Sequence, residues 1–150
     1  MKFRRLSIQE LEHLKDDFIK FLASNTITAL DWEKTKQETP QKAEELIEIF
    51  SDVVMEKVYS KIELLELIEP KSIVFFKFDD ELMTILGINS NAEIDFTQLT
   101  EINSEMQISA FRQTKVLEKA QKPLEIHRLV ESGALIGRAN LFKTLNQMVE

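Results

Sequence analysis

Three consecutive acidic residues, Asp79, Asp80 and Glu81, interrupt the apolar stretch formed by residues 71–95. Adjacent carboxylates can bind a hard cation, and their mutual repulsion can raise the pKa of one of them enough for it to act as an acid. The same residue types favour the exposed turn between two strands, where they need no catalytic purpose. We expect a hairpin turn here rather than a reactive site.

A second polar pattern follows at alternate positions, as at the start of a calcium-binding loop: Asn89, Asn91, Glu93 and Asp95. An EF-hand loop then requires glycine at its sixth position and glutamate at its twelfth. Those positions hold Ile94 and Thr100. The calcium pattern therefore fails, and alternation equally describes the polar face of an extended segment.

Two histidines, His13 and His127, are the side chains whose ordinary pKa is closest to neutrality. His13 has Asp16 and Asp17 at helical-neighbour spacing, which favours a solvated face. His127 shares a predicted helix with apolar residues, which favours a partly buried structural role. A zinc site built from them would need two further carboxylate ligands, an uncommon combination.

Signatures of catalysis and of cofactor binding are missing from the sequence. The chain has no cysteine, no G-x-S-x-G elbow and no S-x-x-K set. Its three glycines form neither a Walker loop nor a dinucleotide fingerprint. We therefore predict no catalytic residue, no cofactor and no metal, and we expect a reducing compartment from the lack of cysteine.

The candidate interaction residues are Arg4, Arg5 and Trp32. The two arginines lie beside Phe3 and Leu6 and could bind a phosphate or an acidic partner, although nearby acids such as Glu12 could equally satisfy them. Tryptophan and arginine are enriched at binding hot spots. A single tryptophan can also pack against its own core.

Helices are predicted at the start of the chain and in its middle. Ser7 and Glu10 have the spacing of a capping box, and an apolar stripe then continues to about residue 22. Thr28 and Asp31 repeat the capping pattern before a short polar helix. Pro40 occupies a first helical position, which predicts a helix over about 40–59.

Strands are predicted at about 73–78 and 82–88, separated by the acidic turn. Both alternating sets of side chains in the first strand are largely apolar, so we expect helices to cover both faces of the sheet. Residues 61–69 are compatible with a helix or a strand, and the strand is favoured because Pro70 and the strand-like "SIVFFKF" follow at once. Residues 106–117 leave strand and helix open.

Two further helices are predicted near the end of the chain. Pro123 begins the first of them, and Gly133 ends it as a C′ glycine. Gly137 precedes the second. The whole pattern predicts an α+β fold over 1–150 as a single globular domain. Helices at the N- and C-termini pack on a small, mostly antiparallel sheet with one or two more strands.

The charge distribution bears on partners. The net charge is −7, yet residues 106–150 carry seven basic and four acidic side chains. A long-range positive field is missing, which argues against nucleic acid as the main partner.

No apolar run has the length of a membrane span, and no signal peptide is evident at the start. We predict a cytoplasmic protein without a membrane partner; the small-molecule ligand, if any, is unknown.

Four short sequence segments resemble those of a known family: "MKFRRLS" at the start, "IFSDVV" in the long predicted helix, "FFKF" in the first strand and "RLVESGALI" near the end. With these segments the chain resembles an uncharacterised bacterial family of small domains of unknown function. The resemblance covers nearly the whole chain. It implies a bacterial single-domain protein and no particular activity.

Three functions remain open. The leading hypothesis is a non-catalytic, cytoplasmic protein-interaction or regulatory module, with a protein partner or self-association. Its surface should show an apolar patch or a self-complementary face. The first alternative is a small enzyme whose site is assembled from acids and His127 without a motif. The second is weak nucleic-acid contact through residues 106–150, whose two helices loosely resemble a helix-turn-helix.

Overall fold

The computed structural model describes residues 1–91 and 93–149 of the chain. Within them lie six α-helices and a five-stranded antiparallel sheet, with helices at both ends of the chain, so the predicted α+β fold is confirmed. The chain divides into two compact units, residues 1–58 and residues 59–150, which are described separately. That the whole chain is one folding domain stays a prediction.

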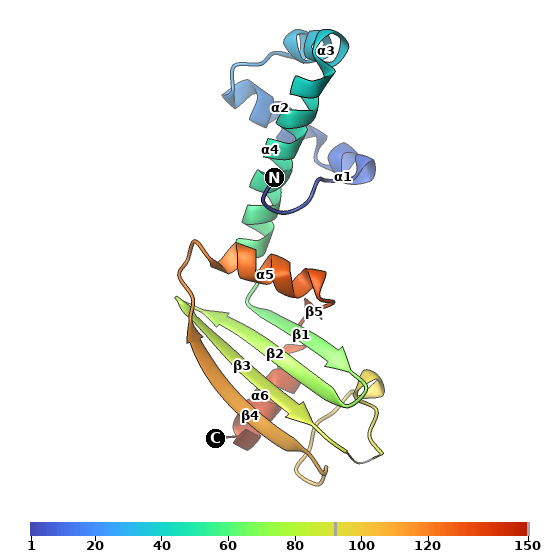
Figure 1. Ribbon diagram of the computed structural model, residues 1–150, viewed down its shortest axis with the longest axis vertical. Coiled ribbons are helices and arrows are strands. Elements are labelled where there is room, and N and C mark those ends of the chain that lie inside the picture. Colours follow the sequence, from blue (N-terminus) through green and yellow to red (C-terminus); the bar gives the residue numbers. More distant parts are fainter. Residues whose placement is uncertain (92, 150) are drawn as a thin grey trace. The chain divides into compact units, whose positions relative to one another are not determined.

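The first unit is entirely helical (Figure 1). Both predicted capping boxes are present, because the Ser7 and Thr28 side chains accept hydrogen bonds from the backbone three residues later. Helix α4 begins at the proline that the sequence placed at a first helical position. The helices are α1 (Ile8–His13), α2 (Lys15–Ser24), α3 (Ala29–Glu38) and α4 (Pro40–Ser60), the last two residues of α4 belonging to the second unit.

One continuous apolar stripe was expected from residue 8 to residue 22, but the structure divides it at Leu14. Hydrogen bonding continues through this bend, since the Leu14 N–H donates to Glu10 and its carbonyl accepts from Phe18. The bend leaves Ile8 77% exposed. The predicted stripe therefore spans two helices, α1 and α2, rather than one.

Aromatic rings and a pinned N-terminal segment hold the first unit together. The rings of Phe18 and Phe21 lie 5.0 Å and 5.3 Å from that of Phe50 on α4. Leu6 is buried, and its N–H donates to the fully buried Ser51 hydroxyl. These contacts anchor α2 and the first residues of the chain to the same helix.

The second unit is built on the sheet, whose strand order is β4-β3-β2-β1-β5 (Figure 1). Both predicted strands are confirmed within a residue or two, and the strand reading of 61–69 was the correct alternative. Residues 106–117 also contribute a strand. The strands are β1 (Leu64–Glu69), β2 (Ser72–Asp79), β3 (Leu82–Asn89), β4 (Ser109–Val116) and β5 (Leu135–Ile136).

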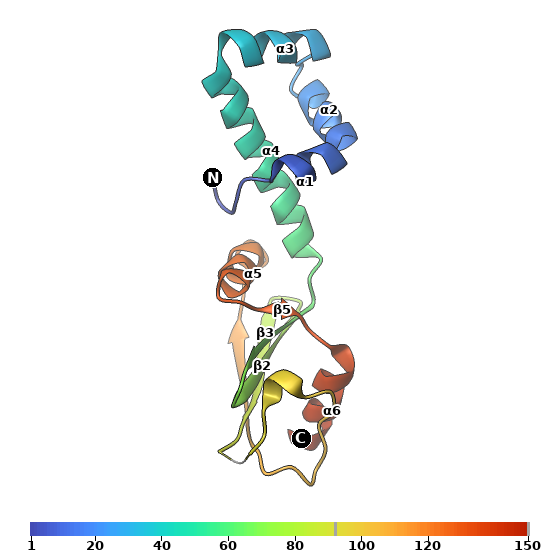
Figure 2. The same ribbon diagram turned by 90° about the vertical axis from the view of Figure 1, so that its right-hand side faces the viewer.

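Helix α6 (Ala139–Val149) covers one side of the sheet, which we call the α6 face (Figure 2). Leu141 and Leu145 of this helix are buried among residues of β2 and β3, and the short 3₁₀ helix η1 (Phe96–Gln98) completes the cluster. The fully buried side chains of this cluster include Ile73, Phe75, Leu86, Ile88 and Phe96. This side of the sheet is the main core of the unit.

Helix α5 (Lys122–Glu131) lies on the opposite side, the α5 face, and covers only one end of it (Figure 2). A ten-residue helix is about 15 Å long, whereas an eight-residue strand extends about 27 Å. Phe76 and Phe78 are therefore buried, while Val74 is only half-buried and Phe111 is 42% exposed. The expectation that both faces are covered holds for the α6 face and for only part of the α5 face.

The predicted end of α5 at Gly133 is confirmed. Gly133 follows the C-cap Ser132 and has a φ of +105°, a conformation that glycine adopts without the penalty that a Cβ would bring. Its backbone position turns the chain into β5 along the edge of β1. None of the helices in the described residues is both long and apolar enough to cross a membrane.

A buried ion pair connects β1 to the start of α6. Glu66 is 2% exposed, and its carboxylate accepts hydrogen bonds from Arg138 Nε at 2.9 Å and Nη2 at 2.8 Å. The backbone N–H of Arg138 also donates to Glu66, and its Nη1 donates to the Leu99 carbonyl at 2.9 Å. Hydrogen bonding to Glu66 raises the pKa of Arg138 above its ordinary value. One side chain thus links β1, the segment after η1 and α6.

Removing this guanidinium is expected to destabilise the protein strongly. Arg138→Ala leaves the Glu66 carboxylate buried without its cation, and we expect a loss of about 3 kcal/mol, the low end for buried pairs because Arg138 is partly exposed. Urea unfolding monitored by circular dichroism measures the loss. Arg5→Ala removes the exposed pair with Glu44 and should cost at most about 1 kcal/mol. Equal losses in the two variants would contradict the structural role of Glu66–Arg138.

Candidate interaction surface

Strand β4 forms one edge of the sheet, and all eight of its residues are exposed. It pairs with β3 over its full length without a bulge, from Leu82 opposite Val116 to Asn89 opposite Ser109. No other strand of residues 1–91 and 93–149 pairs with its outer side. A long, regular edge of this kind is a template for another chain.

The alternation of hydrogen bonds identifies which backbone groups of β4 point outward. Leu117 donates its N–H to Glu81 on the β3 side. In an antiparallel pair, hydrogen-bonded residues alternate with residues whose groups point away. The odd-numbered residues of β4 therefore bond to β3. The outward N–H and carbonyl groups belong to Ala110, Arg112, Thr114 and Val116.

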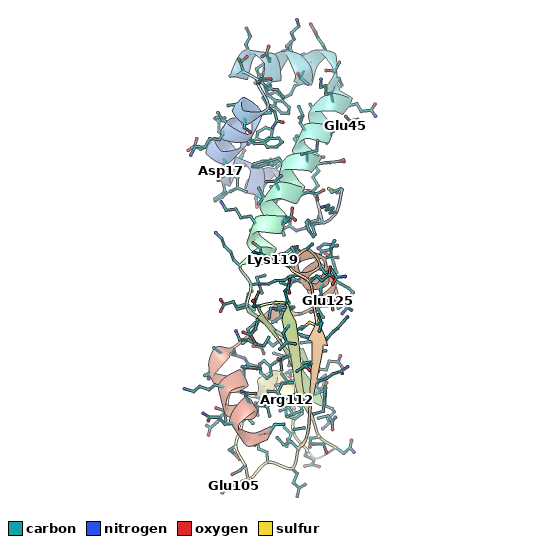
Figure 3. All side chains as sticks on the ribbon, turned by 90° about the vertical axis from the view of Figure 1, so that its left-hand side faces the viewer. Asp17, Glu45, Glu105, Arg112, Lys119 and Glu125 are labelled. Atoms are coloured by element: carbon teal, nitrogen blue, oxygen red, sulfur yellow. The ribbon has the colours of Figure 1, made fainter. Side chains whose placement is uncertain are left out.

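The side chains of β4 divide between the two faces of the sheet. Arg112 extends toward α6, where it donates to the Asn146 carbonyl at 3.2 Å and to the Asn146 side chain (Figure 3). Phe111 lies on the α5 face, directly opposite Gly87. A Cβ on Gly87 would approach the Phe111 ring to 2.4 Å, so the glycine provides the space that the ring occupies.

An apolar row crosses the α5 face where α5 does not cover it. The register places Leu67 opposite Val74, Val74 opposite Gly87 and Gly87 opposite Phe111. These residues range from half-buried to exposed, except for Gly87, which lies under the Phe111 ring. The row ends at the β4 edge. An extended segment added to β4 would therefore meet backbone partners and the exposed side chain of Phe111 at the end of this row.

The three candidate interaction residues of the sequence lie in the first unit. Arg4 pairs with Glu10 at 2.8 Å and Arg5 with Glu44 at 2.7 Å, so neither uses the acids that the sequence suggested. Trp32 on α3 packs edge-on against Phe18 at 5.1 Å between ring centroids. It is half-buried. An interaction role for Arg4, Arg5 and Trp32 stays a prediction.

A second candidate surface lies beside Arg4. A groove of about 450 Å³ runs between α1 and the second half of α4. Its floor is mainly apolar, and Arg4 and Glu10 lie at its border. The apolar lining consists of Leu6, Leu14, Val54, Met55 and Val58. The groove offers apolar contact to a partner, but it lacks free backbone groups of a strand edge.

The groups proposed for a catalytic alternative do not share one site. The acidic turn borders a cleft of about 530 Å³ together with Lys77, Lys119 and Lys122. His127 instead lies against Tyr59, with 3.0 Å between Nδ1 and the Tyr59 hydroxyl. The His13 ring contacts the Gln9 carbonyl on α1. Within the described part of the chain, no three His, Asp or Glu side chains come close enough to hold a metal ion.

The two C-terminal helices also differ from a helix-turn-helix. Strand β5 separates them, and they lie on opposite faces of the sheet (Figure 2). A helix-turn-helix requires two helices joined by a short turn and packed together. The sequence suggested this pairing because it could not show that a strand occupies part of "SGALIG".

Sequence reasoning did not identify β4 as a candidate surface. Its signal was weak, since "SAFRQTKV" mixes apolar, polar and basic residues without strong alternation. The absence of proline and glycine from these eight residues was the available indication of a regular strand. That β4 is an edge depends on strand order, which no local pattern encodes.

The ion pair between Arg4 and Glu10 in the first unit can be tested through the pKa of Glu10. Hydrogen bonds from the Arg4 guanidinium, then from the Ser7 N–H, lower the pKa of Glu10 from 4.5 to about 2. The pair therefore contributes stability above pH 4.5 that is lost as the pH falls toward 2. Arg4→Ala should raise the pKa of Glu10 in an NMR titration of side-chain carboxyls.

Asp31 is the matched control for that titration. Backbone and side-chain hydrogen bonds from Thr28 lower the pKa of Asp31 in the second capping box, without an arginine. Its pKa should not change in Arg4→Ala. An unchanged pKa of Glu10 would show that Arg4 does not hold this carboxylate.

The N–H groups of β4 point alternately toward β3 and toward solvent, which predicts an alternating pattern of amide hydrogen exchange in dilute protein. The N–H groups of Ala110, Arg112, Thr114 and Val116 should exchange with solvent deuterium at least about tenfold faster than those of Phe111, Gln113 and Lys115, because only the latter donate to β3. NMR-detected hydrogen exchange resolves the individual residues. Uniform protection along β4 would contradict the free edge.

Comparison with known proteins places the chain in a family. The family described as "Family of unknown function (DUF6495)" matches residues 1–150. No curated protein and no solved structure matches the chain. The resemblance inferred from the sequence is thus confirmed for a family of about 150 residues and unknown function. The chain belongs to DUF6495.

Proposed function

We propose that the protein is a non-catalytic, cytoplasmic interaction module that binds another polypeptide by adding it as a strand to β4. The observation that carries this proposal is the eight-residue, fully exposed edge with four residues directing backbone groups outward. Main-chain hydrogen bonds provide affinity in this mode, and alternate side chains provide specificity.

The edge has few of the features that protect other sheets from pairing. Protected edges are short, bulged or covered, or they contain proline or charged side chains, especially lysine. Strand β4 has eight residues in unbroken register and no proline. Its one protective feature is its two charges, Arg112 and Lys115, which lie on opposite faces of the sheet. Arg112 donates to Asn146. A hydrogen bond from Arg128 lowers the pKa of Glu125 on α5, and the charge of Lys115 adds a smaller effect in the same direction.

The apolar row supports the same role. Phe111 is exposed next to the edge, and an aromatic side chain at such a position is a common anchor at interfaces. A strand added to β4 would cover its open side. The edge and Phe111 together offer a partner apolar contact beside backbone groups that can form hydrogen bonds with it.

The catalytic alternative has weaker support. It requires acids and His127 around one cleft, whereas the acidic turn and His127 have different neighbours. An interaction through the first unit, at the groove beside Arg4, lacks any feature that specifies its occupant. Strand addition at β4 is the role with a defined geometry.

Thr114→Pro tests the proposed function without disturbing the sheet. The Thr114 N–H points outward, and proline is tolerated where a strand N–H faces solvent. Tagged protein recovered from its own cells should retain a stoichiometric polypeptide that Thr114→Pro retains at least about tenfold less, because one hydrogen bond is lost and the ring obstructs the added strand.

Thr114→Ala is the matched control, since it removes the same side chain and keeps the N–H. It should retain the polypeptide as the unmodified protein does. Thermal unfolding of both variants checks that the fold is intact. If Thr114→Pro retained every polypeptide in unchanged amount, strand addition at β4 would be excluded.

A further inference from the structure

We infer that the strand added to β4 is β4 of a second copy of this chain, paired antiparallel about a twofold axis at Gln113. This inference rests on the proposed function and names its partner. It creates a continuous ten-stranded sheet from two five-stranded ones. The reasons lie in the register of the outward groups and in the side chains that this register places together.

The backbone of β4 is self-complementary in one register. Only residues with outward groups can form hydrogen-bonded pairs, so Ala110, Arg112, Thr114 and Val116 must pair among themselves. With Gln113 on the axis, Arg112 lies opposite Thr114 of the second copy, and Ala110 lies opposite Val116. Each of the four residues then meets another of the four. All outward N–H and carbonyl groups of residues 110–116 are satisfied.

The registers with the twofold axis at a neighbouring residue of β4 pair the two copies less favourably. An axis at Arg112 places Arg112 directly opposite itself, and like charges directly opposite are destabilising. An axis at Phe111 pairs only Ala110 with Arg112 and leaves Thr114 and Val116 beside the chain that precedes β4. An axis at Thr114 pairs Ala110 with Glu118, beyond the end of the strand. The register about Gln113 avoids each of these defects.

On the α5 face, the register about Gln113 places compatible side chains together. Gln113 lies opposite itself, where two amides can bond to each other. Phe111 lies opposite Lys115 of the second copy, whose aliphatic stem can cover the exposed side of the ring while its ammonium remains in water. Because Phe111 is 42% exposed in one copy, this contact buries apolar surface twice in the symmetric pair.

On the α6 face, an exposed residue meets an apolar groove. Val116 is 74% exposed, and this register places it opposite Ala110 of the second copy. Ala110 borders a groove of about 390 Å³ between the start of β4 and the end of α6. The rest of the lining is mostly apolar: Ser104, Met106, Ile108, Leu145, Met148 and Val149. By symmetry each copy supplies one valine and one groove.

The charges of β4 determine how salt should act. The two Arg112 residues lie diagonally across the pair, about 7–8 Å apart at their Cα atoms. Their weak repulsion is screened by salt. The pair of copies should therefore become no weaker as the salt concentration rises. An acidic peptide bound to Arg112 and Lys115 would instead dissociate more readily.

A cysteine at the axis tests the register. Gln113 lies opposite itself as a non-hydrogen-bonded pair, with Cα atoms about 4.5 Å apart, within the range of a disulfide. The chain has no other cysteine. Under mild oxidation, Gln113→Cys should convert to a covalent dimer on a non-reducing gel. Adding Thr114→Pro to it should reduce the dimer at least tenfold.

Single cysteines on either side serve as matched controls. Phe111→Cys and Lys115→Cys should each remain monomeric when oxidised alone, because neither residue lies opposite itself. A mixture of the two, one carrying a tag, should form the mixed dimer, because Phe111 and Lys115 lie opposite each other. Cross-linking of Lys115→Cys with itself would overturn the register about Gln113.

Light scattering of the unmodified protein separates this inference from the proposed function. A mass that rises from monomer to dimer with concentration, and does so less for Thr114→Pro, supports the second copy. A monomer at every concentration, with no Gln113→Cys dimer, overturns it. If Thr114→Pro still removed a different polypeptide in the recovery experiment, the proposed function would stand with another partner. If Thr114→Pro reduced the recovery of no polypeptide, both the proposed function and the pairing of two copies would be excluded.

Discussion

The ion pair between Glu66 and Arg138 determines how the second unit is arranged. Glu66 lies on the α6 face of β1, and a carboxylate buried there requires a cation close by. Arg138 supplies it from the residue before α6 and bonds the Leu99 carbonyl as well. The start of α6 and the segment after η1 are thereby held against β1. The large aliphatic and aromatic residues of β2 and β3 can then close over Leu141 and Leu145.

This arrangement leaves the remaining surface to be covered by one short helix. Because α6 occupies one face, α5 is left for the other, and its ten residues cover only one end. The uncovered end carries the row from Leu67 to Phe111. Among residues 1–91 and 93–149, no strand pairs with the outer side of β4, whereas β5 pairs with β1 at the other edge of the sheet. The free edge and the exposed Phe111 therefore lie on the same strand.

The first unit follows different physical rules. Its first three helices are short. Capping boxes begin α1 and α3, and the rings of Phe18 and Phe21 on α2 pack against Phe50 of the longer helix α4. Arg4 and Trp32, which stand out in the sequence as binding residues, have partners within this unit. Residues of these types mark binding sites only where the fold leaves them exposed and unpaired, which depends on neighbours distant in sequence.

The sequence by itself determined the local elements: the two capping boxes, the proline start of α4, the hairpin around Asp80 and the end of α5 at Gly133. Each depends on residues within about five positions of one another, so a local pattern contains the necessary information. The family resemblance was also visible in short words of sequence. The strand reading of 61–69 depended on Pro70 and on the strand-like segment "SIVFFKF" that follows it.

Only the tertiary structure decided which strand lies at the edge, which face remains open and which acid is buried. Glu66 sits in "LLELIE", where nothing local distinguishes it from the exposed Glu69, because its burial depends on Arg138, 72 residues away. Strand β4 is likewise an ordinary strand until its place in the sheet is known. Strand order and helix placement arise from contacts between distant residues, and these contacts decide where a chain of ordinary local elements can bind another.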